Sequence, residues 1–144
     1  MKAFTRVLTL TLVVILLALS LTACADRVEE GEYVLGDKGM TGCYDSYYFD
    51  GKEFSYSVYI QYVKQEELSY AGTYVLELIE PEDEEQALED EENLIKRGNI
   101  TFTWTDSKGE TKTETKAVVI DEYEWTLTVS GAYGDMIYTL YYEE

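Results

Sequence analysis

The stretch Ile100-Thr101-Phe102-Thr103-Trp104-Thr105 alternates large apolar side chains with threonines. Successive side chains of a β-strand point to opposite faces, so this period of two predicts a strand with one buried face and one threonine face. The loop Asp106-Ser107-Lys108-Gly109 follows, and Thr111, Thr113 and Thr115 begin a return strand. Threonine opposite threonine suits a solvent-facing ladder. The two segments therefore predict an antiparallel hairpin.

The same period of two extends along most of the chain after residue 31. Residues 43–63 are expected to form a hairpin around Asp50-Gly51, because both residues of that dipeptide tolerate positive φ. Its second strand places five residues on one face: Phe54, Tyr56, Val58, Ile60 and Tyr62. Further strands are expected at 32–35, 73–79, 123–129 and 136–142. About eight short strands predict an all-β fold, an antiparallel up-and-down β-barrel, because closure removes exposed edges.

Residues 82–93, Glu-Asp-Glu-Glu-Gln-Ala-Leu-Glu-Asp-Glu-Glu-Asn, form an acidic insertion between the predicted strands. Repulsion between the carboxylates argues against a stable helix there, beyond one turn around Ala87 and Leu88. The run lacks the alternate ligand spacing and the glycine of a calcium loop. We therefore expect no metal site, but a charged loop that binds cations weakly and without specificity.

The first 24 residues have the order of parts of a secretory signal. Lys2 and Arg6 precede an apolar run over residues 7–19, and Leu21-Thr22-Ala23-Cys24 closes the segment. This tetrapeptide resembles the lipobox of bacterial lipoproteins. The resemblance implies a diacylglycerol on the sulfur of Cys24, cleavage before Cys24, and a membrane-anchored protein of the bacterial cell envelope.

Three parts of the chain follow from this signal: a signal peptide over 1–23, a lipidated tether over 24–31, and a β-barrel domain over 32–144. The first 23 residues hold two of the 11 basic residues and none of the 29 acidic ones, so the remaining chain carries a net charge of −20. Such a charge opposes binding to nucleic acid and favours basic partners.

The absence of histidine from the chain removes the commonest general base and the commonest metal ligand. Lipidation of Cys24 leaves Cys43 without an intramolecular disulfide partner, and a lone cysteine is usually a small buried hydrophobe. Without a recognisable nucleophile or metal set, we expect neither an enzyme nor a cofactor.

Four segments of the predicted sheet carry a family resemblance. Tyr48-Phe49-Asp50-Gly51-Lys52-Glu53-Phe54, Tyr70-Ala71-Gly72-Thr73-Tyr74, Ile100-Thr101-Phe102 and Trp125-Thr126-Leu127-Thr128 are similar to the small lipocalin-like domains of bacterial lipoproteins. The resemblance spans most of residues 42–142 and implies a lipocalin-like barrel. Most such domains have no assigned activity, so the resemblance implies fold more than function.

Aromatic side chains are the strongest indication of a binding surface. Tyrosine offers a rigid apolar body with a polar tip and is enriched where proteins bind partners. Ordinary strand propensity and core filling also explain the 14 tyrosines. The candidate binding residues are Tyr48, Tyr56, Tyr59, Trp104 and Trp125.

Two functions remain open at this point. The first is a lipid-anchored binding protein that holds a small apolar ligand in its barrel or a partner on its tyrosine-rich sheet. The alternative is an acidic inhibitor or partner of a basic envelope or secreted enzyme, for which small barrel-type lipoprotein inhibitors of lysozyme offer an analogy. The oligomeric state is left open by the sequence.

Overall fold

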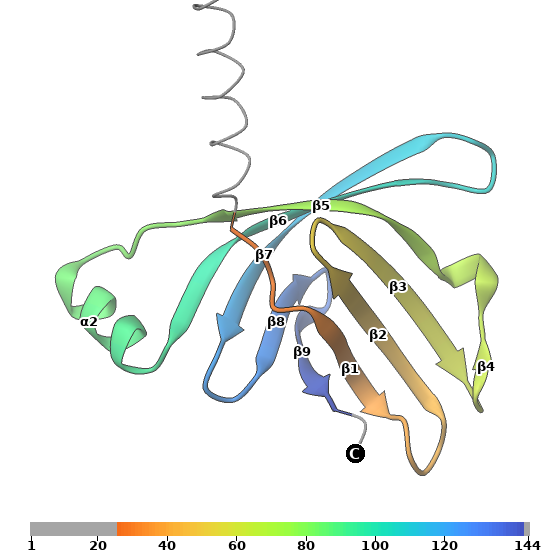
Figure 1. The fold of residues 1–144 in the computed structure, drawn as a ribbon, viewed down its shortest axis with the longest axis horizontal. Coiled ribbons are helices and arrows are strands. Elements are labelled where there is room, and N and C mark those ends of the chain that lie inside the picture. The colour runs from red at the N-terminus through yellow and green to blue at the C-terminus, as the bar shows by residue number, and fades with distance from the viewer. Residues whose placement is uncertain (1–25, 143–144) are drawn as a thin grey trace, which may run out of the picture.

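Antiparallel β-strands make up most of the computed structural model, which describes residues 26–142. Eight of them wind into a closed barrel, so the predicted all-β, up-and-down fold is confirmed (Figure 1). The eight strands are β1 (Gly31–Asp37), β2 (Cys43–Asp50), β3 (Glu53–Ile60), β5 (Tyr70–Leu78), β6 (Ile95–Thr105), β7 (Thr111–Asp121), β8 (Thr126–Gly131) and β9 (Gly134–Tyr141). The remaining elements are β4 (Val63–Lys64), a 3₁₀ helix (Glu66–Leu68) and α2 (Glu84–Glu92).

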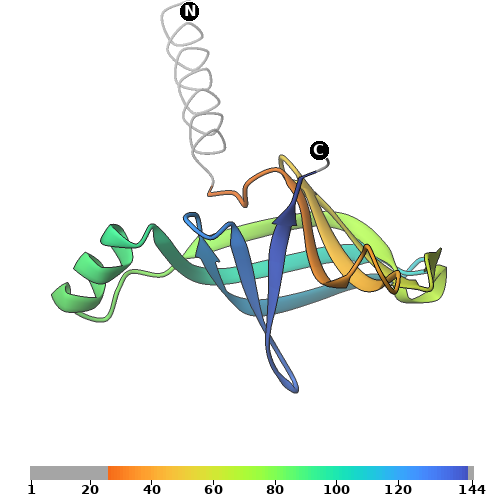
Figure 2. The same ribbon diagram turned by 90° about the horizontal axis from the view of Figure 1, so that it is seen from below.

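The barrel closes because β1 pairs on both of its edges. One edge runs along β2 from Gly31 opposite Phe49 to Asp37 opposite Cys43. The other edge pairs with β9 over only three residues, Glu32 to Val34. Pairing of β2 with β3 then completes the circuit. Figures 1 and 2 show α2 and β4 at opposite ends of the molecule, outside this circuit.

Aromatic rings fill the barrel interior. Phe102 is fully buried, and its ring centroid lies 4.6 Å from that of Phe54 and 5.2 Å from that of Tyr47. Aromatic pairs at these separations add about 0.5–1.5 kcal/mol each beyond the area that they bury. The core comprises Val28, Tyr33, Tyr47, Phe49, Phe54, Tyr74, Leu76, Ile100, Phe102, Val118, Ile120, Leu127, Val129, Tyr138 and Leu140.

The threonine-rich hairpin forms as predicted. Threonines face one another across β6 and β7, and the hydroxyls of Thr101 and Thr115 lie 2.9 Å apart on the exposed face. Ile100 and Phe102 occupy the opposite, buried face. The period of two therefore assigned the two faces of this hairpin correctly.

Two strands are shorter than the alternation predicts. β3 ends at Ile60, because Gln61 and Tyr62 have positive φ values of 50° and 67° and turn the chain into β4. The side chain of Tyr62, predicted to face the core, is 61% exposed. β8 likewise begins only at Thr126, since the Asp121 carboxylate accepts hydrogen bonds from two backbone amides and folds residues 121–125 into a turn.

The expectation that residues 82–93 form no stable helix is wrong. Asp83 caps α2 by accepting a hydrogen bond from the Gln86 amide at 2.8 Å, and acidic residues in the first turn favour the positive end of the helix dipole. Asp90 is buried and forms a bidentate pair with Arg97 of β6, with both N–O distances at 3.0 Å. This partner from another element offsets the repulsion between carboxylates.

Within residues 26–142, no helix has the length and apolar character that crossing a bilayer requires.

The start of the described chain belongs to the core, although it was predicted as a polar tether. Val28 is 2% exposed, and its backbone amide donates a hydrogen bond to the Tyr74 hydroxyl at 3.2 Å. The lipidation site predicted at Cys24 lies outside the described residues. Cys43, expected to be a buried hydrophobe, is exposed at the start of β2.

Replacing the central core ring tests the packing. Phe102→Ala is expected to lower the free energy of unfolding by about 3–5 kcal/mol, because it opens a cavity between several aromatic rings. Thr103→Ala, on the outer face of the same strand, is expected to change it by less than about 0.5 kcal/mol. Urea denaturation measures both, and equal losses would contradict the assigned core.

Candidate functional site

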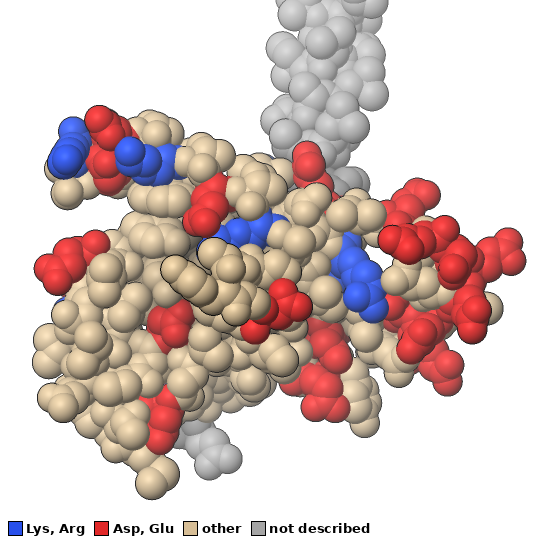
Figure 3. All heavy atoms as spheres, turned by 180° about the vertical axis from the view of Figure 1, so that it is seen from behind, with Lys and Arg blue, Asp and Glu red and all other residues tan. Residues whose placement is uncertain are grey.

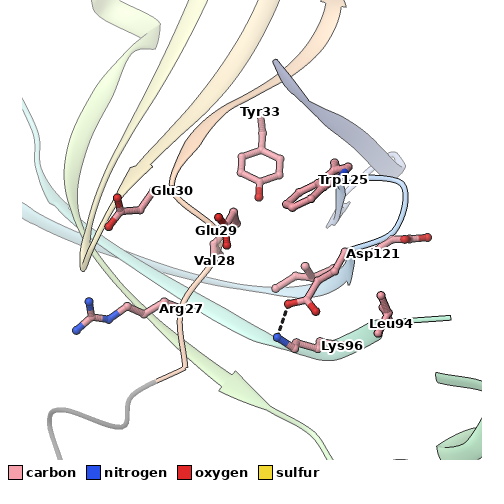
Figure 4. Close-up of a pocket in the computed structure, with 11 residues that line it drawn as sticks. Arg27, Val28, Glu29, Glu30, Tyr33, Leu94, Lys96, Asp121 and Trp125 are labelled. Atoms are coloured by element: carbon pink, nitrogen blue, oxygen red, sulfur yellow. Dashed lines mark hydrogen bonds and ion pairs between the residues drawn. The ribbon is translucent and has the colours of Figure 1, made fainter. Parts of the chain in front are cut away.

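A pocket of about 650 Å³ opens at the end of the barrel where the described chain begins (Figure 4). Three segments that are distant in sequence build it: residues 27–30 together with Tyr33 of β1, residues 94–96 at the start of β6, and residues 120–125 around the β7–β8 turn. The packed barrel interior lies beneath. The available space is thus at the end of the barrel and not within its aromatic core.

The pocket has an apolar floor and a partly exposed rim. Val28, Tyr33 and Ile120 form the floor, and each is no more than 4% exposed. Leu94 and Trp125 stand at the rim, 50% and 42% exposed. An apolar floor with few polar groups is the usual composition of a small-molecule site.

The Tyr33 hydroxyl is the polar group of the floor. Figure 4 shows it directed into the space between Glu29 and Trp125. Burial raises the pKa of this hydroxyl above its ordinary value, and the charge of Glu29 raises it further. It therefore stays protonated and can donate a hydrogen bond to a molecule in the pocket.

Charged side chains surround the apolar floor, with carboxylates in excess. Lys96 pairs with Glu122 across the pocket wall, so these two charges offset each other. The side chains that carry charge in the lining are Arg27, Lys96, Glu29, Glu30, Asp121 and Glu122. Two cations against four carboxylates make the rim negative, which favours a positively charged group over a negatively charged one.

Backbone strain accompanies the pocket. Leu94 and Trp125 both have a φ of +55°, a left-handed conformation that costs a residue with a Cβ about 1–2 kcal/mol. Only Gln61 and Tyr62 share this conformation among the other non-glycine residues of the described chain. Backbone hydrogen bonds hold both rim residues: the Leu94 carbonyl accepts from the Glu122 amide, and the Trp125 carbonyl accepts from the Leu140 amide. Strain of this kind concentrates at functional sites.

A second polar group, Asp45 of β2, lies inside the barrel away from this pocket. Its Oδ2 accepts hydrogen bonds from the hydroxyls of Tyr56 and Tyr138, at 2.8 and 2.7 Å. Burial raises the pKa of both tyrosines, and the hydrogen bonds to Asp45 raise it further. The carboxylate therefore accepts hydrogen bonds from two tyrosine hydroxyls of the barrel interior, which indicates a structural role.

The five candidate binding residues do not gather at one place. Trp125 lines the pocket, and Tyr56 binds Asp45. Trp104 stacks on Tyr70 with ring centroids 4.4 Å apart. On the outside of the barrel, Tyr59 stacks on Tyr44 and Tyr48 is 49% exposed.

Several pocket residues were missed in the sequence. Val28 is the one apolar side chain in the polar run 26–30, and that signal was available. Leu94 and Lys96 gave no signal, because the acidic insertion separates them from the rest of the wall. Tyr33 was assigned to a predicted strand, but the sequence did not show that its side chain faces the barrel interior.

Acidic side chains concentrate on α2, as Figure 3 shows at one side of the molecule. Residues 80–92 hold nine of the 29 carboxylates. Across the described part of the chain, no cluster of three or more acidic or cysteine side chains has a geometry that suits a metal ion.

Comparison of the chain with protein-family models, with curated proteins and with solved structures finds no match.

Relieving the strain at the rim is expected to stabilise the protein. Leu94→Asn should raise the free energy of unfolding by about 0.5–1 kcal/mol, because asparagine tolerates positive φ better than leucine. Gln61→Asn, at a comparable φ outside the pocket, serves as the matched control and should stabilise similarly. Thermal and urea denaturation measure both; destabilisation by Leu94→Asn alone would show that the leucine contributes more to folding than its exposure indicates.

Alkaline pH is expected to destabilise the fold through its buried tyrosines. Burial raises the pKa of Tyr70 to about 12 and raises that of Tyr47 as well. An unfolded tyrosine loses its proton near pH 10, so the unfolded chain binds fewer protons than the folded one above that pH. The stabilising contribution is therefore complete below about pH 10 and is lost as the pH rises through the folded pKa.

Urea denaturation between about pH 8 and pH 11.5 measures this loss. Tyr70→Phe should reduce the slope of stability against pH, whereas Tyr123→Phe, at a side chain 73% exposed, should leave it unchanged. Equal slopes for the wild type and both variants would exclude burial as the cause.

Proposed function

We propose that this chain is a non-enzymatic binding protein of the bacterial cell envelope, anchored by lipid on Cys24. Its ligand is a small amphiphile with an apolar body and a positively charged polar end. The domain is lipocalin-like, and its binding site is the pocket at the end of the barrel.

The pocket floor carries this proposal. Val28 and Ile120 offer buried apolar surface, and the Tyr33 hydroxyl is directed into the pocket (Figure 4). Burying apolar area releases about 25 cal/mol per Å², and a hydrogen bond to the Tyr33 hydroxyl contributes about 0.5–1.5 kcal/mol. A ligand with an apolar body and one hydrogen-bonding group gains on both counts.

The sign of the ligand charge follows from the lining. The excess of carboxylates over cations leaves a negative potential at the rim, and the low-dielectric floor strengthens it. An ammonium group is attracted, and a carboxylate or phosphate is repelled.

The predicted anchor supports the same site. Arg27 lines the pocket three residues after Cys24, a span of at most about 10 Å of extended chain. A lipid on Cys24 would hold the pocket, and not the opposite end of the barrel, close to the bilayer. An amphiphile that partitions into the membrane would then be concentrated at the pocket mouth.

Binding of three ten-carbon probes tests the proposal. Trp104→Phe leaves Trp125 as the sole tryptophan and therefore as a fluorescence reporter at the pocket rim. At about pH 8, decylamine is positively charged, decanol neutral and decanoate negatively charged. We expect decylamine to bind more tightly than decanol, and decanoate to bind most weakly.

Two variants locate the binding. Tyr33→Phe keeps the ring but removes the hydroxyl, and should weaken decylamine binding about 5–10-fold. Leu94→Asn should weaken binding at the rim, whereas Gln61→Asn should not. Saturable binding that neither Tyr33→Phe nor Leu94→Asn weakens, or no binding of any probe, would overturn the pocket as the site. Failure of all probes would favour the second candidate function, an acidic partner of a basic protein, which rests on the carboxylates concentrated on α2.

A further inference from the structure

One edge of the barrel sheet is left open along half of β7. On one side, β6 pairs with β7 over the whole strand, from Thr111 to Asp121. On the other side, β8 pairs only with Val118–Asp121. Residues 111–117 therefore have a strand on one side only, and Figures 1 and 2 both show this hairpin diverging from β8 and β9.

The open edge is accessible. Every residue from 111 to 117 is exposed except Lys116, which is partly buried. An edge strand presents unpaired amide and carbonyl groups that can template pairing with another strand. Lysines and other charges on an edge usually prevent such pairing. On this edge, however, the order of the charges suits pairing with a second copy of the same strand.

The segment Glu110-Thr111-Lys112-Thr113-Glu114-Thr115-Lys116 is complementary to itself in the antiparallel direction. A two-fold axis through Thr113 places Lys112 opposite Glu114 of a second copy, and Glu110 opposite Lys116. Symmetry repeats both pairs, so four opposite-charge pairs form. On the outer face, Thr113 lies opposite Thr113 of the second copy, and Thr111 lies opposite Thr115.

The charges also disfavour the two registers that are centred on the neighbouring residues. Moving the axis to Glu114 places that carboxylate opposite itself and Lys112 opposite Lys116. Moving it to Lys112 places that ammonium opposite itself and Glu110 opposite Glu114. Like charges directly opposite one another destabilise a strand pair, and opposite charges stabilise it. Of these three registers, only the one centred on Thr113 has opposite charges throughout.

We propose that two copies of this chain pair through the open edge of β7, antiparallel and centred on Thr113. The pair is isologous, because a two-fold axis places the same surface of both copies in contact. A seven-residue edge is smaller than a standard protein interface, so we expect a dissociation constant of about 1–100 µM. The net charge of −20 repels the two copies over long distances, and physiological salt screens that repulsion beyond about 8 Å.

Complementary charge reversals test the pairing. The barrel core lies wholly within residues 26–142, so the chain from residue 26 to 144 is suitable for sedimentation. Lys112→Glu alone and Glu114→Lys alone each place like charges opposite one another, and each should weaken self-association at least about tenfold. An equimolar mixture of the two variants should dimerise again, because every cross-strand pair is then opposite in charge. The double variant should dimerise for the same reason.

Disulfide trapping tests the register. Cys43→Ser removes the exposed cysteine from the background. Facing Cα atoms of antiparallel strands lie about 4.5–5.5 Å apart, within disulfide reach, so Thr113→Cys should cross-link two copies under mild oxidation. Thr111→Cys is the matched control, because in this register the two copies of residue 111 lie about 14 Å apart along the strands.

Three results would overturn the proposal. The first is a wild-type chain that stays monomeric at about 500 µM, well above the expected dissociation constant. The second is single variants that dimerise as tightly as the wild type. The third is equal cross-linking at residues 111 and 113. Restored association in the mixture supports the proposal and cannot arise from a general effect of either substitution on folding, since each variant is present unchanged.

Discussion

The pairing of β1 with both β2 and β9 is the constraint on which the rest of the structure depends, because it turns an open sheet into a barrel. An eight-stranded barrel has an interior just wide enough for side chains or one small ligand. Aromatic rings around Phe102 occupy this interior. Closure and filling together leave the available space at the end of the barrel, where residues 27–30 line a pocket above the packed core.

Tyrosine makes this filling feasible without leaving buried hydroxyls unpaired. Tyr56 and Tyr138 share one carboxylate oxygen of Asp45, and the Tyr74 hydroxyl donates to the Gly51 carbonyl at 2.9 Å while it accepts from the Val28 amide. Each ring supplies packing surface, and each hydroxyl has a fixed partner. The Tyr33 hydroxyl is directed into the end pocket (Figure 4).

The alternation of side chains predicted the strands and their buried faces, because the period of two reflects backbone geometry directly. It failed where the alternation continues but the backbone turns: Tyr62 and Trp125 fit the pattern, yet both have positive φ. It failed at α2 because Arg97 of β6 pairs with Asp90 and so stabilises a helix whose carboxylates repel one another. The pocket was only partly predictable, since its walls come from segments that meet only after the barrel closes. Trp125 was among the candidate binding residues, whereas Tyr33 and Leu94 were not.

The burial of Val28 has a mechanical consequence. Force applied to the chain before Asp26 does not stretch a slack linker, because Val28 is packed in the core and hydrogen-bonded to Tyr74. The load passes within a few residues to β1, which is held by strands on both edges. Pulling along β1 loads many backbone hydrogen bonds in parallel, so such a force is resisted by the whole barrel and not by its first residues alone.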